Sequence, residues 1–503
     1  MHWADNFAKQ VVESRNKEEY VVESGITPSG IVHIGNAREI LTQYYVYLGI
    51  LKLGKKVKFQ YIWDDFDRFR KVPKGIPAKF EKYIGRPLTK IPDPFGCHNS
   101  YAEHFEFKFM EEILQLGIKP VYLSASKLYE KGSFTENIKL ALEKTEKIMK
   151  ILNKFRLEPL PEDWLPVNLY CEKCWKDCTK IKYLGDYKIS YKCDCGFENE
   201  IDFRKTRIIK LKWRVDWASR WAYFKVDFES SGKEHKSRGG SWDTSVLISK
   251  EIFDYKPPIG PMYEFIHLKG QKEKMSSSAG NIATISQLLK IFEPPIIRFL
   301  YTQRLNKTIF IPFDLDIYRI YNDFDKSERI YFGLEKGSDE LKRKYELSKI
   351  EDYETCPKRI SFSELTFLVQ LISEEKLRNY IKNLMKSRGI EMTNLDLDLS
   401  LERASRAKYW IENYAPEEVK IKLSSEKIDL TEEQRELLKK FIKIIKKPIS
   451  TEELQKQIFE LSKGKEIFEL CYRVLIGKTH GPKLAMLIDA IGREKVIERL
   501  SSI

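Results

Sequence analysis

The sequence predicts an α/β protein whose parallel sheet is divided by an inserted segment and followed by an all-helical C-terminal region. Three observations predict this fold class. Residues 20–67 run through strand, glycine-rich turn, helix and strand. A segment rich in cysteine and histidine separates them from a second α/β stretch at residues 208–290. Beyond Pro294 and Pro295 the apolar residues recur at helical spacing.

The first half of the α/β domain is predicted within residues 1–85. Residues 20–22 form a short apolar strand, residues 34–53 a helix that stops at Gly54, and residues 57–63 a second strand. A glycine-containing turn joins the first strand to the helix. This order of elements is typical of the start of a nucleotide-binding parallel sheet.

Residues 86–207 are predicted to be the inserted segment, because the α/β pattern stops there and resumes afterwards. The second half of the α/β domain, residues 208–290, is predicted to contain a strand at 222–228, a helix at 243–253 and a strand at 263–268.

The remainder is predicted to be helical throughout. Residues 291–350 are interpreted as a helical connecting domain and residues 351–503 as an α-helical domain. Thr431 with Gln434, and Ser450 with Glu453, have the spacing of capping boxes that open successive amphipathic helices.

Composition indicates a folded protein with a basic surface. The 503 residues are 42% hydrophobic and 32% charged, which excludes a disordered chain. No apolar run reaches membrane-spanning length, and the first residues lack the apolar core of a signal peptide, so we expect a cytoplasmic protein without a membrane partner. A formal net charge of +14 favours a polyanion such as RNA, and equally describes a lysine-rich solvated surface.

The turn after the first strand has residues suited to phosphate binding. Its glycines let the backbone approach a ligand, and the N–H groups of the following helix favour phosphate. His33 and Asn36 lie on one face of the first helical turn and can donate hydrogen bonds to phosphoryl oxygens. The alternative is a turn with a capping Asn36 and a surface histidine. The predicted ATP contacts here are Pro28, Ser29, Gly30, His33, Gly35 and Asn36.

A second motif follows the strand predicted at residues 263–268. Its members, also predicted to bind ATP, are Lys274, Met275, Ser276, Ser277 and Ser278. An ammonium on a loop flanked by glycines can close on a triphosphate and stabilise pyrophosphate as it leaves. Alone, the motif is equally a serine-rich linker. The two motifs in this order are a stronger signal than either.

Together the two motifs resemble the His-Ile-Gly-His and Lys-Met-Ser-Lys-Ser signatures of class I aminoacyl-tRNA synthetases. Asn36 stands in place of the second histidine and Ser277 in place of the second lysine. These paired departures resemble the class I lysyl-tRNA synthetases of archaea and some bacteria. Further matching segments are residues 2–5, 63–73, 92–98 and 239–244. The resemblance is dense over residues 1–300 and loose beyond them.

The resemblance implies a Rossmann-type catalytic domain, a zinc-containing insertion near the acceptor stem and an α-helical anticodon-binding region. It further implies that the carboxylate of L-lysine attacks the α-phosphate of ATP, bound with Mg²⁺, in line to form lysyl-adenylate. The lysyl group then passes to the 3′-terminal ribose of tRNA(Lys). His33, Asn36 and Lys274 are the catalytic residues that it implies.

The resemblance also places the amino-acid-binding residues, which are Gly25, Thr27, Asp65, Trp213, His235 and Tyr263. Trp213 and Tyr263 would sandwich the aliphatic stem, and Asp65 would hold the α-ammonium. Without the resemblance, ordinary core packing is the better explanation of the two aromatic residues, and Asp65 would belong to a solvated loop that pairs with Arg68 or Arg70. The acceptor for the ε-ammonium stays open among Asp216, Glu23 and Glu264.

Two clusters within the inserted segment are candidate metal sites with a structural role. Cys171, Cys174, Cys193 and Cys195 can supply four thiolates from two turns, as structural zinc requires, and Cys178 is a spare ligand. The second set is Asp93, Cys97, His98 and His104. The alternatives are reduced cysteines in a small β-rich insertion and, at the second set, a buried histidine with an inert cysteine.

Three competing functions are weighed. A class I glutamyl- or glutaminyl-type synthetase would need a cation for its substrate, whereas the matched segments are aromatic and acidic. A non-catalytic tRNA-binding paralogue would be expected to lose His33 or Lys274. A small nucleotidyltransferase is opposed by the chain length, the cysteine cluster and the helical end.

Overall fold

The computed structural model describes residues 1–270, 283–424, 428–461 and 466–502. The chain forms two compact units. Unit 1 comprises Met1–Leu289, Ile297–Ile311 and Gly337–Ile350, and unit 2 comprises Lys290–Ile296, Pro312–Lys336 and Glu351–Ile503. The predicted phosphate loop at residues 274–278 lies outside the described residues.

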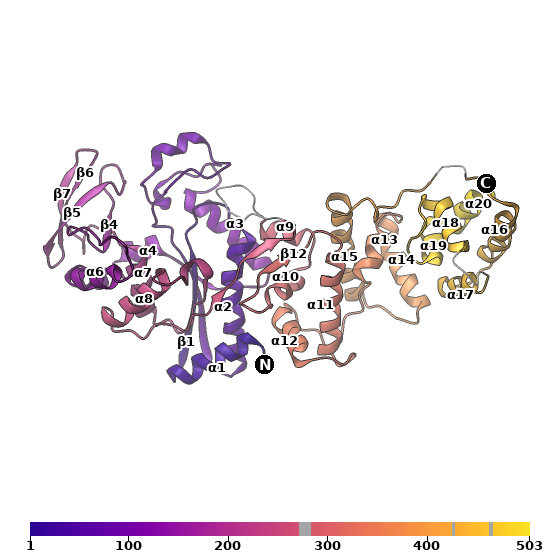
Figure 1. Ribbon diagram of the computed structural model, residues 1–503, viewed down its shortest axis with the longest axis horizontal. Coiled ribbons are helices and arrows are strands. Elements are labelled where there is room, and N and C mark those ends of the chain that lie inside the picture. Colours follow the sequence, from indigo (N-terminus) through magenta and orange to yellow (C-terminus); the bar gives the residue numbers. More distant parts are fainter. Residues whose placement is uncertain (271–282, 425–427, 462–465, 503) are drawn as a thin grey trace. The chain divides into compact units, whose positions relative to one another are not determined.

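A parallel sheet forms the centre of unit 1 (Figure 1). Its strands β1 (Glu19–Ile26), β2 (Lys56–Trp63) and β3 (Val121–Ser124) pair in parallel in the order β1-β2-β3. Phe228 extends the sheet by parallel bridges to Val22 of β1 and to Ile259. The predicted parallel α/β sheet is therefore confirmed.

One helix packs on strands β1 and β2, and a second helix packs against the first. The first is α2 (Ile34–Lys52) and the second is α1 (Trp3–Arg15). A Cβ atom at Gly49 of α2 would lie 2.8 Å from the Cβ atom of Ala8 in α1, so the two backbones approach as closely as small residues allow.

The segment predicted as an insertion contains helices and small antiparallel sheets. Its helical elements are η2 (Leu88–Lys90), α3 (Tyr101–Gln115), α4 (Ala125–Lys131), α5 (Thr135–Glu143) and α6 (Thr145–Asn153), and η1 (Ala78–Tyr83) precedes it. Its strands are β4 (Val167–Leu169), β5 (Thr179–Gly185), β6 (Lys188–Cys193) and β7 (Glu198–Asp202), and β4 pairs with β8 (Ile209–Leu211), which follows it. Strand β3 of the main sheet also lies within residues 86–207, and the predicted domain limits stay predictions.

The second α/β stretch differs from its predicted elements in two places. Its elements are α7 (Trp213–Phe224), β9 (Ser231–Gly232), η3 (Lys233–His235), α8 (Ser241–Glu251), β10 (Met262–Tyr263), β11 (Ile266–Leu268) and α9 (Ile285–Leu289); α10 (Pro294–Tyr301) and β12 (Ile309–Ile311) follow it. The helix predicted at residues 243–253 is confirmed by α8. The strand predicted at 263–268 is two short strands, because β10 pairs with β9 and β11 with β12.

The strand predicted at residues 222–228 is wrong. Helix α7 continues to Phe224, and Lys225 ends it with a left-handed backbone of φ 56°. Trp213, Trp217 and Trp221 recur every four residues and pack along one helix face, the first pair stacked and the second tilted by 48°. This spacing carries the helix through the residues that read as a strand. Only Phe228 joins the sheet.

The described part of unit 2 is helical. Its helices are α11 (Ile317–Tyr331), α13 (Phe362–Leu368), α14 (Glu374–Ser387), α15 (Asn394–Asn413), α16 (Glu432–Ile445), α17 (Thr451–Leu461), α18 (Glu466–Ile476), α19 (Leu484–Ile491) and α20 (Arg493–Ser501); α12 (Asp339–Ser348) belongs to unit 1. The prediction of helix throughout the remainder is wrong at β12, where alternating Ile309 and Ile311 are buried and pair with β11.

Helix capping in unit 2 follows the sequence. Thr431 and Gln434 form the predicted capping box, and the Ser450 hydroxyl accepts the Glu453 N–H at 3.2 Å. No helix in the described part of the chain is both long and apolar enough to cross a membrane.

Candidate active site

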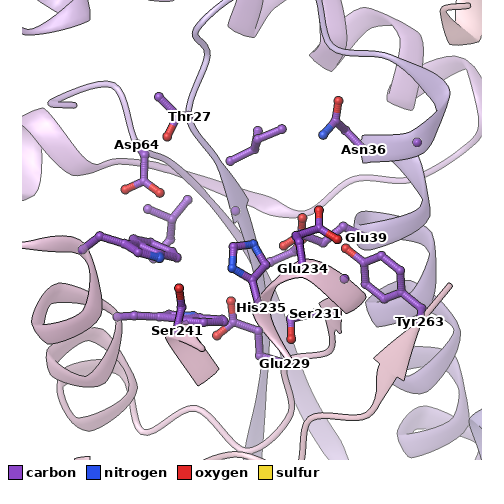
Figure 2. A pocket seen from close by; sticks show the side chains of 18 of the residues that line it. Thr27, Asn36, Glu39, Asp64, Glu229, Ser231, Glu234, His235, Ser241 and Tyr263 are labelled. Carbon is purple, nitrogen blue, oxygen red and sulfur yellow. The ribbon is translucent and has the colours of Figure 1, made fainter. Parts of the chain in front are cut away.

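A cavity of about 470 Å³ opens at the carboxyl ends of β1 and β2, beside the N-terminus of α2. Parallel α/β sheets place ligands at this edge. Eight of the residues predicted to bind ATP or the amino acid line it, namely Gly25, Thr27, His33, Gly35, Asn36, Trp213, His235 and Tyr263. In Figure 2, His235 lies between Asp64 on one side and Tyr263 on the other.

His33 and Asn36 form a capping box at the start of α2. Nδ1 of His33 accepts the Gly35 N–H at 3.0 Å, and Oδ1 of Asn36 accepts the His33 N–H at 3.3 Å. Because Nδ1 is an acceptor, the neutral imidazole carries its proton on Nε2. The Asn36 oxygen is engaged as well, which leaves the amide NH₂ as its donor. The capping interpretation and the donor interpretation of this motif therefore describe the same geometry.

Two glycines at this end of the cavity leave no room for a side chain. A Cβ atom at Gly35 would lie 2.8 Å from Cε1 of His33, so a larger residue would displace the capping ring. A Cβ atom at Gly25 would lie 2.6 Å from the carbonyl oxygen of Ile62. Both positions require glycine for close approach.

The lining of the cavity is strongly acidic. Seven carboxylates line it, those of Glu23, Glu39, Asp64, Asp67, Glu229, Glu234 and Glu264. Among the described residues, Arg70 and Arg220 are the permanently charged cations in the lining. The excess of acid gives the cavity a negative potential, which attracts cations.

Asp64 and Asp67 are among the acids that already pair with basic side chains. Asp64 accepts a hydrogen bond from Nη2 of Arg220. Asp67 accepts hydrogen bonds from the Thr27 hydroxyl at 2.8 Å and from Nζ of Lys210. Although burial of Asp67 acts to raise its pKa, the Lys210 charge lowers that pKa below its usual value.

A second group of lining acids forms no ion pair with a described basic side chain. Burial raises the pKa of Glu229 to about 7, and the indole N–H of Trp221 donates to its Oε2 at 2.5 Å. Burial, followed by the nearby Glu229 charge, also raises the pKa of Glu23 and of Glu39 well above the usual carboxyl value. A cation in the cavity would stabilise the ionised form of these acids.

Aromatic rings form the wall beside the acids. The rings of Trp213 and Trp217 stack with centroids 5.0 Å apart, and the Trp217 and His235 centroids are 5.6 Å apart. Tyr263 is 8% exposed, and Glu39 and Glu234 lie near it (Figure 2). Flat apolar surface next to carboxylates suits a ligand that has an aliphatic stem and a positive end.

Several predicted site residues lie outside this cavity. Asp65 does not line it, because its Oδ1 accepts the Ser126 N–H at 2.7 Å on the other side of β2, and Asp64 lines the cavity instead. Asp216 is fully buried and accepts hydrogen bonds from Arg220 and from Tyr129, both at 2.6 Å. Pro28, Ser29 and Gly30 belong to the turn before α2 and are not among the lining residues. Lys274, Met275, Ser276, Ser277 and Ser278 lie outside the described residues.

Sequence reasoning missed Glu39, Arg220, Glu229 and Glu234 as cavity residues. Glu39 is three positions after Asn36, which places it on the same face of α2, so helical spacing was a usable signal. Arg220, Glu229 and Glu234 have no local signal, because the tertiary fold alone brings them to the cavity.

The four cysteines predicted to bind metal come together. Their sulfur atoms all lie within 4.8 Å of one another. The Cys171–Cys195 and Cys174–Cys193 sulfur separations are 3.7 and 3.6 Å. Four thiolates at about 2.3 Å from one tetrahedral ion would be about 3.8 Å apart. The set therefore fits a metal ion, and Cys178 is exposed and outside it.

The second predicted set also comes together. Sγ of Cys97 lies 3.2 Å from Asp93 Oδ2, 3.1 Å from His98 Nδ1 and 3.2 Å from His104 Nδ1. Backbone N–H groups of Phe95, Cys97 and His98 hold the Asp93 carboxylate in place. Although Cys97 and His98 are adjacent along the chain, the loop brings both together with Asp93 and His104 and offers four ligand atoms to one ion.

Comparison with known proteins gives the family. A sequence model of the class I tRNA synthetases (K) matches residues 1–351, and one of an anticodon binding domain matches residues 402–503. Three relatives named lysine–tRNA ligase match over nearly their whole length. That of Pyrococcus horikoshii is 42% identical over 99% of both chains. Those of Methanocaldococcus jannaschii and Borreliella burgdorferi are 39% and 37% identical over 100% of this chain and 99% of theirs. Full-length identity at this level, together with the match to residues 1–351, establishes that the chain belongs to the class I tRNA synthetases (K).

Proposed function

We propose that the protein attaches L-lysine to tRNA(Lys) with ATP, through a lysyl-adenylate intermediate. The observation that carries this proposal is the cavity with seven carboxylates and two arginines beside the His33 turn. A lysine side chain brings the positive charge that these acids lack. The names of the full-length relatives support the same substrate.

The lysine substrate is proposed to lie along the aromatic wall. Asp64, rather than the predicted Asp65, holds the α-ammonium, because Asp64 lines the cavity. Trp213 and Tyr263 contact the aliphatic stem. Glu229 and its neighbour Glu23 receive the ε-ammonium, since burial leaves both acids in need of a cation.

The other two candidates for the ε-ammonium fit less well. Asp216 lies outside the cavity and is already held by Arg220 and Tyr129. Glu264 lines the cavity, but Nζ of Lys233 donates to it at 2.9 Å.

The N-terminus of α2 is proposed to bind ATP through the predicted turn residues. Nε2–H of His33 and the amide NH₂ of Asn36 donate to phosphoryl oxygens, whose charge grows as the lysine carboxylate attacks the α-phosphate. Lys274 supplies a further positive charge for the leaving pyrophosphate. Mg²⁺ bound with ATP neutralises phosphate charge.

The remaining assignments concern tRNA and metal. The domain matched at residues 402–503 is proposed to bind the anticodon of tRNA(Lys), and the inserted segment is proposed to bind its acceptor stem.

The two metal clusters are proposed to hold structural Zn²⁺. The ligands are Cys171, Cys174, Cys193 and Cys195 in the first cluster, and Asp93, Cys97, His98 and His104 in the second. Bound zinc would fix the loops that carry these ligands. We also propose that the domains end at residues 85, 207, 290 and 350, as the sequence predicts, and that the protein is cytoplasmic.

The test is ATP–pyrophosphate exchange with lysine and with glutamate, each with and without tRNA(Lys). We expect exchange with lysine and none with glutamate. Exchange with glutamate only would establish the glutamyl-type alternative, which the acidic cavity opposes. The absence of exchange under every condition would instead support the non-catalytic paralogue.

A further inference from the structure

A second cavity, of about 400 Å³, lies on the other side of β2 from the active site. Its walls come from the end of β2, strand β3, and helices α3 and α4. Trp63, Asp65, Tyr122 and Glu106 line it, and it shares no lining residue with the first cavity.

The end of β2 separates the two cavities, because its successive side chains point alternately to one cavity and to the other. Ile62 and Asp64 line the active-site cavity, whereas Trp63 and Asp65 line the second one. Successive residues of an extended chain point to opposite sides, so neighbouring positions serve different spaces.

Three side chains of the second cavity have buried polar atoms without a hydrogen-bond partner among the described residues. They are Oε1 of Glu106, Nε1 of Trp63 and the hydroxyl of Tyr122. Glu106 is 9% exposed and Trp63 is 2% exposed. Native proteins pair nearly all such atoms, so unpaired groups gathered around one cavity point to a ligand or ordered water there.

The charge of the lining selects the kind of ligand. Among the described lining residues, four carboxylates, those of Asp65, Glu103, Glu106 and Glu130, accompany one lysine, Lys127. This balance disfavours phosphate and other anions. Aromatic and thioether side chains complete the wall, with Trp63 and Tyr122 stacked at 6.3 Å and Phe107 and Met110 beside them.

The mixture of carboxylates and rings distinguishes an organic cation from a metal ion. Mg²⁺ and Ca²⁺ require a shell of oxygen ligands. Both oxygens of Asp65 are already engaged, by the N–H of Ser126 and the hydroxyl of Ser124. Ring faces attract an ammonium, and apolar surface accommodates an alkyl stem.

We propose that this second cavity binds a primary alkylammonium ligand, separately from the amino-acid substrate. A polyamine and a free basic amino acid both carry this group. Glu106 accepts from the ammonium, and the Tyr122 hydroxyl and the indole N–H of Trp63 complete its polar contacts. The alkyl stem lies against Met110 and Phe107.

The test is calorimetric titration of the full chain with cadaverine and, separately, with lysine. The active-site cavity is first filled with a non-hydrolysable lysyl-adenylate analogue. We expect one equivalent of ligand to bind the wild-type protein. Met110→Trp, which fills the second cavity, should weaken this binding at least tenfold. The matched control is Leu114→Trp on the same helix, whose side chain is 53% exposed and which should leave binding unchanged.

A charge variant keeps the proposal testable if Met110→Trp misfolds. Glu106→Gln should also weaken binding tenfold or more, whereas Glu111→Gln, exposed on the same helix, should not. Zinc content is measured for both variants because Glu106 follows His104 closely. Binding of cadaverine alone identifies a polyamine site, and equal binding of lysine identifies a site for basic amino acids.

Three results would overturn the proposal. They are the absence of binding by both amines, binding that survives Met110→Trp and Glu106→Gln, and displacement of the amine by millimolar Mg²⁺. Failure of the adenylate analogue to bind would count against the proposed function only. In that case the Met110→Trp protein should still bind one equivalent of amine fewer than the wild-type protein, and this difference measures binding in the second cavity.

Discussion

Asn36 accepts the backbone N–H of His33 through Oδ1 at 3.3 Å, so the residue that replaces the second signature histidine closes the cap of α2. The same side chain is left with an amide NH₂ that can reach toward a phosphate. The cap and the proposed donor role therefore use different atoms of one side chain.

Substitution of Asn36 by aspartate should separate these two roles. Asn36→Asp keeps an oxygen to accept the His33 N–H but loses the NH₂ donor. We expect native thermal stability and a fall of about 10²-fold in the rate of adenylate formation. Asn36→Ala should lose both the cap and the rate. Full activity of Asn36→Asp in pyrophosphate exchange would exclude the donor role.

Lys274 should act on phosphate rather than on lysine. This prediction comes from the sequence motif, since the residue lies outside the described part of the chain. Lys274→Ala should slow single-turnover adenylate formation by about 10²-fold or more while the lysine Kd changes little. The control is Lys250→Ala at the exposed end of α8. Equal losses in rate and in lysine affinity would contradict the assignment.

Lysine affinity should depend on pH through Glu229. Burial raises the pKa of this carboxyl to about 7. At lower pH the acid is neutral and cannot attract an ammonium by charge. The lysine Kd should therefore fall as pH rises from about 6 to about 8, a range in which the lysine ε-amine, with a pKa of about 10.4, stays charged. Glu229→Gln should weaken binding and flatten this dependence, and the exposed Glu251→Gln should not. A wild-type Kd that is constant across this range would argue against Glu229.

Each metal cluster should hold one zinc ion. Metal analysis of the purified protein should give about two zinc ions per chain, since each set provides four ligand atoms. Cys171→Ser and His104→Ala should each lose one ion and lower the melting temperature. Cys178→Ser is the matched control, because Cys178 is exposed and outside the cluster. Retention of two ions in Cys171→Ser would remove the first site from the proposal.

Unit 2 depends on a buried arginine. Arg403 is fully buried and donates to Glu293 Oε1 at 2.7 Å and to Asp325 at 2.8 Å. Arg403→Ala would leave two carboxylates without their cation and should lower the free energy of unfolding of this unit by about 3–5 kcal/mol. Arg378→Ala, which removes an exposed ion pair with Asp398, should cost no more than about 1 kcal/mol. Denaturant unfolding of the two variants makes the comparison, and equal losses would refute it.

Sequence patterns predict those features whose residues are close together along the chain. The His33 turn was predicted because a strand, glycines and an amphipathic helix each leave a short-range pattern. The cysteine cluster was predicted because Cys171 with Cys174, and Cys193 with Cys195, are close in sequence. The helix at Ser241–Glu251 and the Thr431 capping box follow the same logic.

The strand predicted at residues 222–228 failed for a related reason. A run of apolar and aromatic residues fits both a buried strand and a buried helix. The packing of Trp213, Trp217 and Trp221 settles the choice in favour of helix α7, and that packing requires the partners that the fold supplies.

By itself, then, the sequence determined the order of the elements, the His33 turn and the four-cysteine cluster, since each depends on residues that are neighbours along the chain. Only the tertiary structure decided that Asp64 faces the active site while Asp65 faces the second cavity. It alone decided that Glu39 and Glu229, from distant elements, share one acidic cavity. Strand register decides which side of the sheet a residue faces, and packing decides which remote charges lie near it. Neither can be read from the neighbouring residues in the sequence.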